Sequence, residues 1–174
     1  SDGNAAVTER GVVYATTQNP TTANTKVKNG TGTGSFTCNL TGLQPNTTYY
    51  VRAYAINSKG TAYGTQVTFT TNKQIVLPTV TTTTATSVTE TSAVTGGNVT
   101  SDGNATVTER GVVYATTQNP TTSNTKVKNG TGTGSYTCNL TGLQPNTKYY
   151  VRAYAINSKG TAYGTQVTFT TTES

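Results

Sequence analysis

The sequence predicts an all-β chain built from tandem antiparallel β-sandwiches, and three observations lead to this fold class. Residues 1–72 and 101–172 are the same sequence offset by 100 positions, with 67 of 72 residues matching. Threonine supplies 45 of 174 residues, and this β-branched residue favours a pleated sheet with one solvated face. Turn signals recur every ~10 residues without helical periodicity, as is typical of sandwiches. Because small domains contain about 100 residues, each period is a whole domain.

The elements of one period follow in order from Pro78, which opens the first strand where a missing N–H is tolerated. Ser101-Asp-Gly-Asn104 supplies a turn, because Asp-Gly readily adopts positive φ. Asn129-Gly-Thr-Gly-Thr-Gly134 is a glycine-rich turn, and Ser158-Lys-Gly160 precedes the last strand. The predicted strands are 79–86, 91–99, 107–116, 124–128, 135–141, 147–157 and 161–171.

The long strand 147–157 shows which residues face the core, because successive side chains alternate between the two faces. Tyr150, Arg152, Tyr154 and Ile156 are assigned to the outward face. The predicted core consists of Tyr149, Val151, Ala153, Leu140, Leu143, Cys138, Val113, Val167 and Phe169.

The period divides the chain into an incomplete repeat (1–72), a linker (73–77) and a complete repeat (78–174). Ser1 matches Ser101, so the first repeat lacks its counterpart of Leu77–Thr100, two strands of a seven-strand sandwich. Their loss would expose apolar core and unpaired strand edges. We expect equivalent strands to cover this flank, supplied either by an upstream repeat of the same polypeptide or by a neighbouring copy.

Composition argues against several function classes. The net charge of +6 comes from 12 Lys and Arg against 6 Asp and Glu, but no basic run exceeds Lys26-Val-Lys28, so nucleic-acid binding is not expected. No apolar stretch approaches the roughly 20 residues of a membrane helix, which argues against membrane insertion. With no His, no paired carboxylates and no cluster of metal ligands, we expect no catalytic residue, no cofactor and no metal site.

The two cysteines, Cys38 and Cys138, occupy equivalent positions in the two repeats. A disulfide needs Cα atoms within about 7 Å, whereas equivalent sites in successive domains are expected roughly 30 Å apart, given the length of a strand. We therefore predict two free thiols that behave as small apolar side chains.

Two local patterns have ordinary structural interpretations. Gly130-Thr-Gly-Thr-Gly134 lacks the Lys-Ser/Thr of a phosphate-binding loop and opens no helix, so a hairpin turn is predicted. Glu109 and Arg110 are adjacent and point to opposite faces, and we expect one of them to meet Arg152 or Tyr150 across the sheet.

The run from Leu143 to Gly160, repeated at Leu43–Gly60, resembles the corner and the following strand of fibronectin type III domains. The runs Val107–Tyr114 and Thr168–Thr171 are similar to the fibronectin type III-like repeats of Bacteroidetes-type bacterial surface and secreted proteins. The resemblance implies an immunoglobulin-like sandwich at an extracellular or bacterial cell-surface location. It also implies that Tyr149 is a corner tyrosine, buried and hydrogen-bonded to nearby backbone.

The candidate partner-binding surface is an outward stripe of aromatic and basic side chains present in both repeats. Tyr and Arg are enriched where proteins bind partners, and tyrosine rings also suit sugars. The alternative is a self-contained ladder in which the arginine stacks between tyrosines. The stripe consists of Tyr50, Arg52, Tyr54, Tyr150, Arg152 and Tyr154.

The leading hypothesis is therefore a non-enzymatic extracellular repeat, structural or adhesive, within a longer stalk, adhesin shaft or filament. Its expected partners are other copies or repeats of the same protein, through end-to-end stacking or strand exchange. One alternative is a module that binds surface glycans or proteins through the Tyr/Arg face. The other alternative is an accessory domain of a secreted hydrolase.

Overall fold

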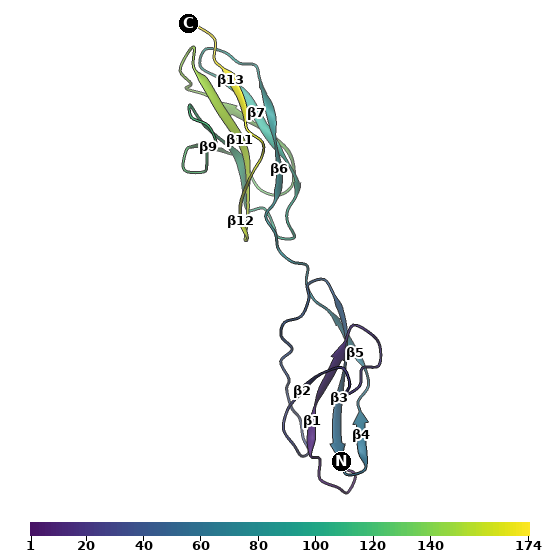
Figure 1. Cartoon of the computed structure of the whole chain (residues 1–174). Coiled ribbons are helices and arrows are strands. Elements are labelled where there is room, and N and C mark those ends of the chain that lie inside the picture. Colours follow the sequence, from purple (N-terminus) through teal and green to yellow (C-terminus); the bar gives the residue numbers. More distant parts are fainter. The chain divides into compact units, whose positions relative to one another are not determined.

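The computed structural model describes every residue from Ser1 to Ser174 and contains strands and loops without any helix (Figure 1). No helix able to cross a membrane is therefore present. The chain divides into two compact units, unit 1 (Ser1–Gln74) and unit 2 (Ile75–Ser174). The boundary falls inside the segment 73–77 that we predicted as a linker.

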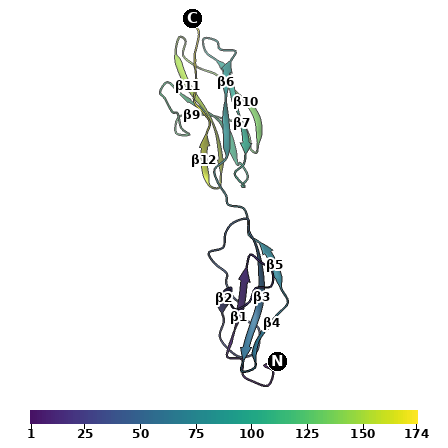
Figure 2. The same ribbon diagram turned by 45° about the vertical axis from the view of Figure 1, so that its right-hand side comes forward.

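Unit 2 is a complete sandwich of two antiparallel sheets (Figures 1 and 2). Its strands are β6 (Thr79–Thr86), β7 (Ala93–Ser101), β8 (Glu109–Ala115), β9 (Thr125–Lys128), β10 (Gly134–Leu140), β11 (Lys148–Asn157), β12 (Gly160–Tyr163) and β13 (Val167–Thr170). One sheet has the order β10–β7–β6; the other has the order β12–β11–β8–β9, with β13 also paired to β11. This arrangement confirms the predicted immunoglobulin-like, fibronectin type III-like fold class.

The predicted last strand, 161–171, is interrupted in the structure. β12 and β13 both pair with β11, and between them the Gly164 N–H donates to the Ala153 carbonyl at 2.8 Å. Thr82 of the opposite sheet reaches this interruption, where its Oγ1 accepts a hydrogen bond from the Ala153 N–H at 2.9 Å. A Cβ on Gly164 would lie 2.5 Å from that oxygen, so glycine is needed for the close approach of the two sheets.

The core of unit 2 lies between its two sheets and contains most of the predicted core residues. Tyr149 is a corner tyrosine, as predicted: its ring is buried and its hydroxyl accepts a hydrogen bond from the Gln144 N–H at 3.0 Å. Val167 is only partly buried. Val113 is fully buried, as predicted, but it lies on the outer side of its sheet, where the register pairs it with Arg152. The neighbouring Val112 joins the core instead, since adjacent strand residues face opposite sides.

Unit 1 is a single sheet. Its strands are β1 (Glu9–Ala15), β2 (Thr25–Lys28), β3 (Thr48–Asn57), β4 (Gly60–Tyr63) and β5 (Val67–Thr70). The order β2–β1–β3–β4, with β5 paired to β3, matches the larger sheet of unit 2. The first repeat lacks the two N-terminal strands, as the sequence predicts, and no second sheet faces the first. Residues 34–40, which correspond to β10, form no strand.

Candidate functional site

The predicted Tyr/Arg stripe is only partly exposed. Tyr150 and Arg152 of unit 2 are half-buried on the outer face of the larger sheet, as are Tyr50 and Arg52 in unit 1. The third residue of each stripe is buried, with exposed fractions of 2% for Tyr54 and 0% for Tyr154. The expectation that these two tyrosines lie at the surface is wrong, although whether the remaining residues bind a partner stays a prediction.

Tyr154 is buried by charged side chains from neighbouring strands. Its hydroxyl donates to Glu109 Oε1 at 2.8 Å, and Lys126 Nζ lies 5.8 Å from the centre of its ring. Glu109 also accepts ion pairs from Lys126 at 2.8 Å and from Lys128 at 3.2 Å. Together these side chains cover an aromatic ring on the outer face of the sheet.

The same cluster changes the acidity of its members. The Lys126 ammonium, with help from Tyr154 and Lys128, lowers the pKa of Glu109 from 4.5 to about 2. Burial, followed by the hydrogen bond to Glu109, raises the pKa of Tyr154 above its ordinary value. Glu9 of unit 1 has its pKa lowered to about 2 by the equivalent lysines and tyrosine. Both carboxylates therefore stay charged, and they hold the cluster together rather than exchange protons near neutral pH.

Arg152 is engaged within the fold. Its Nε and Nη2 donate to the Pro120 carbonyl at 2.9 and 2.7 Å, and its guanidinium lies 4.1 Å from the centre of the Tyr163 ring. The hydroxyl of Tyr163 accepts from the Thr122 N–H at 3.0 Å. The arginine therefore fastens the loop between β8 and β9 to the sheet, and it stacks on Tyr163 rather than between Tyr150 and Tyr154.

Glu109 and Arg110 do not meet Arg152 or Tyr150, contrary to our expectation. Glu109 binds the lysines described above, since β9 lies beside β8. Arg110 lies 4.9 Å from the centre of the Tyr136 ring and donates to the carbonyls of Asn129, Gly132 and Thr133 at 3.0, 3.3 and 2.7 Å. The glycine-rich turn thus presents carbonyl oxygens to a cation, which is the opposite of a phosphate cradle.

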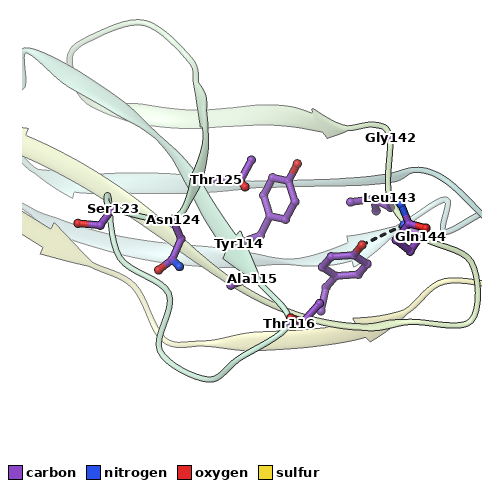
Figure 3. A pocket seen from close by; sticks show the side chains of 10 residues that line it. Tyr114, Ala115, Thr116, Ser123, Asn124, Thr125, Gly142, Leu143 and Gln144 are labelled. Atoms are coloured by element: carbon purple, nitrogen blue, oxygen red, sulfur yellow. Dashed lines mark hydrogen bonds between the residues drawn. The ribbon is translucent and has the colours of Figure 1, made fainter.

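A groove that the sequence did not predict lies at the corner of the larger sheet of unit 2 and of the unit 1 sheet. In unit 2 it has a volume of about 630 Å³ and is lined by residues 114–116, 123–125 and 142–144 together with Tyr149 (Figure 3). Tyr114, Asn124 and Gln144 line it with aromatic or amide side chains (Figure 3). The hydroxyl of Tyr149, which also lines the groove, accepts a hydrogen bond from the Gln144 N–H. Unit 1 has an equivalent groove of about 550 Å³. The side chains that line the grooves are aromatic, hydroxyl, amide and aliphatic ones, so each groove offers hydrogen bonds and ring faces to a ligand.

The two predicted thiols are free. Cys138 is buried between the sheets, and burial raises its pKa to about 11. Cys38 is more accessible, because nothing in unit 1 covers the segment that carries it.

The inner face of the unit 1 sheet is an exposed apolar surface. Val67 and Phe69 are exposed by 59% and 37%, whereas Phe169 in unit 2 is exposed by 8%. A cavity of about 250 Å³ continues this surface at the end of the sheet, lined by residues that include Gly3, Asn57 and Gly60. We define the inner face as the side chains of Leu40, Leu43, Ala53, Val67 and Phe69.

No protein-family model and no curated protein sequence matches the chain. Among solved structures, it is similar to the FN1–FN3 domains of chicken CNTN1, with a TM-score of 0.44, 18% identity, and coverage of 95% of this chain and 54% of that one. It is also similar to titin domains A168–A170, with a TM-score of 0.46, 17% identity, and coverage of 98% and 56%. The chain thus spans about half the length of both fragments.

A third similar structure is the sensor domain of the anti-sigma factor RsgI4 of Pseudobacteroides cellulosolvens. It aligns with a TM-score of 0.42 and 18% identity, covering 58% of this chain and 100% of that one.

Proposed function

We propose that the chain is part of a non-enzymatic structural array, a stalk, adhesin shaft or filament exposed on a bacterial surface. The observation that carries this proposal is that the polypeptide enters and leaves unit 2 at opposite ends of its sandwich (Figure 1). A domain of this kind extends the polypeptide each time it is repeated.

Hydrogen bonds fix both ends of unit 2. At the N-terminal end, the Val76 carbonyl accepts from Asn157 Nδ2 at 2.8 Å, beside the turn between β11 and β12. At the other end, the Thr172 N–H donates to Thr89 at 3.1 Å and its carbonyl accepts from the Asn146 N–H at 3.0 Å. Because β11 has ten residues at about 3.3 Å each, one repeat separates these points by roughly 30 Å.

The charged groups of the outer sheet face support a structural role. Glu109 is held by two lysines, and Arg152 is held by a backbone carbonyl and an aromatic ring. These charged side chains are paired within the domain and stabilise it. That is consistent with a domain that acts as a spacer in the array.

A glycan- or protein-binding module is the second candidate, favoured by the groove that recurs in both units. Tyr114 and Tyr149 are edge-to-face in the unit 2 groove, with centroids 6.0 Å apart, and Tyr14 and Tyr49 repeat this geometry in unit 1. Aromatic faces beside amide groups are suited to sugars and to extended peptides. Two such grooves on one chain would add avidity if both reach the same ligand surface.

Electron microscopy of a polypeptide with several complete periods tests the array. We expect unbranched strings of domains with a spacing of roughly 30 Å per repeat, and compact globules would contradict the proposal. Glycan-array binding tests the alternative. Binding that disappears in a Tyr14→Ala, Tyr114→Ala variant, but persists in Tyr50→Ala, Tyr150→Ala, would assign a ligand to the grooves.

A further inference from the structure

We propose that the inner face of unit 1 is a docking site for a β-hairpin of the β6–β7 type, donated by a further repeat. The inference rests on the proposed tandem array. It adds that a hairpin from one repeat covers the exposed sheet of another. The occupant is identified by the molecule itself, because the same surface in unit 2 is covered by such a hairpin (Figure 2).

The acceptor surface is the same in both units. In unit 2 the hairpin buries Leu140, Leu143, Ala153 and Phe169, each of which is exposed by 8% or less. Their unit 1 counterparts carry identical side chains, and none of them is buried. The docking surface of unit 1 is therefore already formed, without its cover.

Polar groups at the site also match those that bind the hairpin in unit 2. There the Ala153 N–H donates to Thr82, the Leu143 N–H donates to the Thr91 carbonyl, and Asn157 donates to the Val76 carbonyl. The three donors recur in unit 1 as Ala53, Leu43 and Asn57. Unit 1 therefore carries these three donors for the acceptor oxygens of a hairpin that has the same sequence.

The cavity of unit 1 corresponds to the position of residues 76 and 77 in unit 2. Gly103 there lies against the Val76 carbonyl, and Gly160 lies against the Leu77 side chain. Gly3 and Gly60, their counterparts, line the cavity of about 250 Å³ in unit 1. The segment leading into a docked hairpin would fill this space.

The strand arrangement adds a fourth match. β10 pairs with β7 over seven residues, from Gly134 opposite Val99 to Leu140 opposite Ala93. Residues 34–40 have the same sequence except for Phe36 in place of Tyr136, yet they form no strand. A docked hairpin supplies the missing partner, so we expect docking to convert residues 34–40 into a third strand of the new sheet.

Residues 1–174 contain two acceptor faces and one hairpin, and that hairpin already covers unit 2, so the occupant of unit 1 is a further hairpin. If β6 and β7 moved from unit 2 into unit 1 of another copy, they would cover the inner face of that unit 1. They would leave the equivalent face of their own unit 2 uncovered. Exchange between copies therefore gains no buried surface, whereas a hairpin from a further repeat does.

The occupant has a recognisable sequence pattern. A Cβ on Gly97 would lie 2.7 Å from the Ala153 Cβ, and a Cβ on Gly96 would lie 2.0 Å from the Tyr136 carbonyl oxygen. Ala53 supplies the same Cβ in unit 1, and Phe36 would supply the same carbonyl oxygen once residues 34–40 form a strand. We therefore expect the docking hairpin to carry two consecutive glycines in its second strand, after a threonine-rich first strand.

A fusion that adds a second copy of residues 75–100 ahead of Ser1 tests the proposal. The junction recreates the Thr100–Ser101 peptide bond of unit 2, because Ser1 corresponds to Ser101. Cys38 and Cys138 serve as reporters of coverage. Tryptic peptides carrying them differ in mass, since residues 36 and 48 differ from residues 136 and 148, so mass spectrometry follows maleimide labelling of each thiol separately.

We expect the fusion to slow Cys38 labelling by at least about tenfold, toward the rate of Cys138, because a covered thiol reacts only through local opening. The amides of residues 34–40 should gain protection from hydrogen exchange at the same time. A matched fusion with valine at the added copy's counterpart of Gly97 should leave Cys38 as reactive as in the parent chain.

Unchanged Cys38 labelling in the fusion, with Cys138 still protected, would overturn the docking site. Equal protection by the valine fusion would overturn the glycine requirement. The proposed array is tested separately by electron microscopy. Globular multi-repeat particles together with a protected Cys38 would contradict the proposed function but support the docking site.

Discussion

Unit 1 and unit 2 share 67 of 72 aligned residues, yet they present different structures. Phe169 is buried in a core between two sheets, whereas Phe69 is exposed on a single sheet. Residues 134–140 pair with β7 as a strand, whereas residues 34–40 do not form one. The difference shows that the larger sheet follows from the repeat's own sequence, while the β10 strand depends on the partner beside it.

The largest expected effect comes from separating the two units. Residues 75–174 should unfold cooperatively as an isolated domain, whereas residues 1–74 should show no cooperative transition. Leaving a few hundred Å² of apolar surface uncovered costs several kcal/mol, at roughly 25 cal/mol per Å², which is comparable to the about 5–15 kcal/mol stability of a domain. Thermal denaturation followed by circular dichroism checks this, and a soluble, cooperatively melting 1–74 monomer would contradict it.

A Tyr136→Phe substitution gives unit 2 the residue that unit 1 carries. The Tyr136 hydroxyl donates to the Gly111 carbonyl at 2.7 Å inside the core, so its loss should lower the free energy of unfolding of unit 2 by about 1–3 kcal/mol. Chemical denaturation measures the change. The reverse substitution, Phe36→Tyr, should leave the parent chain almost unaffected, because the hydroxyl would have no closed core to enter.

The two corner tyrosines make the same hydrogen bond in unit 2, which has two sheets, and in unit 1, which has one. Tyr149→Phe removes the acceptor of the Gln144 N–H and should destabilise unit 2 by about 1–2 kcal/mol. Tyr49→Phe removes the equivalent bond, 2.9 Å long, from unit 1. The unit 2 denaturation midpoint should respond only to the first variant; a midpoint unchanged by Tyr149→Phe would reject the corner assignment.

The smallest expected effect concerns pH. The pKa of Glu109 in the folded unit, about 2, lies below its ordinary value of 4.5. Its contribution to stability is therefore complete above pH ~4.5 and is lost as the pH falls toward ~2. Glu109→Gln should reduce this acid sensitivity and cost at most about 1 kcal/mol at neutral pH, as is typical of accessible ion pairs. Glu90→Gln is the control, because Glu90 is exposed and makes none of these ion pairs; equal loss of acid sensitivity in both variants would contradict the assignment.

Much of the fold follows from local sequence signals. Alternating side chains and glycine turns located the strands of unit 2, except that β12 and β13 were predicted as one strand. The assignment of inward and outward side chains in β11 was correct from Tyr149 to Ala155. The interruption at Gly164 was not predictable, because it depends on Thr82 approaching from the other sheet. The burial of Val113 was predicted, but the side of the sheet on which it is buried was not predictable, because two adjacent valines give no alternation from which to choose the inward one.

The candidate sites were less predictable than the strands. Alternation correctly directs Tyr154 outward, but its burial depends on Glu109 and Lys126 reaching it from two other strands. The corner groove combines segments around Tyr114, Asn124 and Gln144, which only the folded chain brings together. The exposed inner face of unit 1 was predictable, since it follows from counting strands in a near-identical repeat.

The position of the β6–β7 hairpin within its repeat has a consequence for biosynthesis. In the order of the chain, Thr79–Thr86 and Ala93–Ser101 come before the strands of the larger sheet, which they cover in the folded unit. On the ribosome, each hairpin of the proposed array would emerge after the previous repeat had closed and before its own sheet was complete. Vectorial translation would thus keep near-identical neighbours from trading strands, whereas refolding from denaturant, with every hairpin and every sheet present at once, would favour the misassembly typical of repeat proteins.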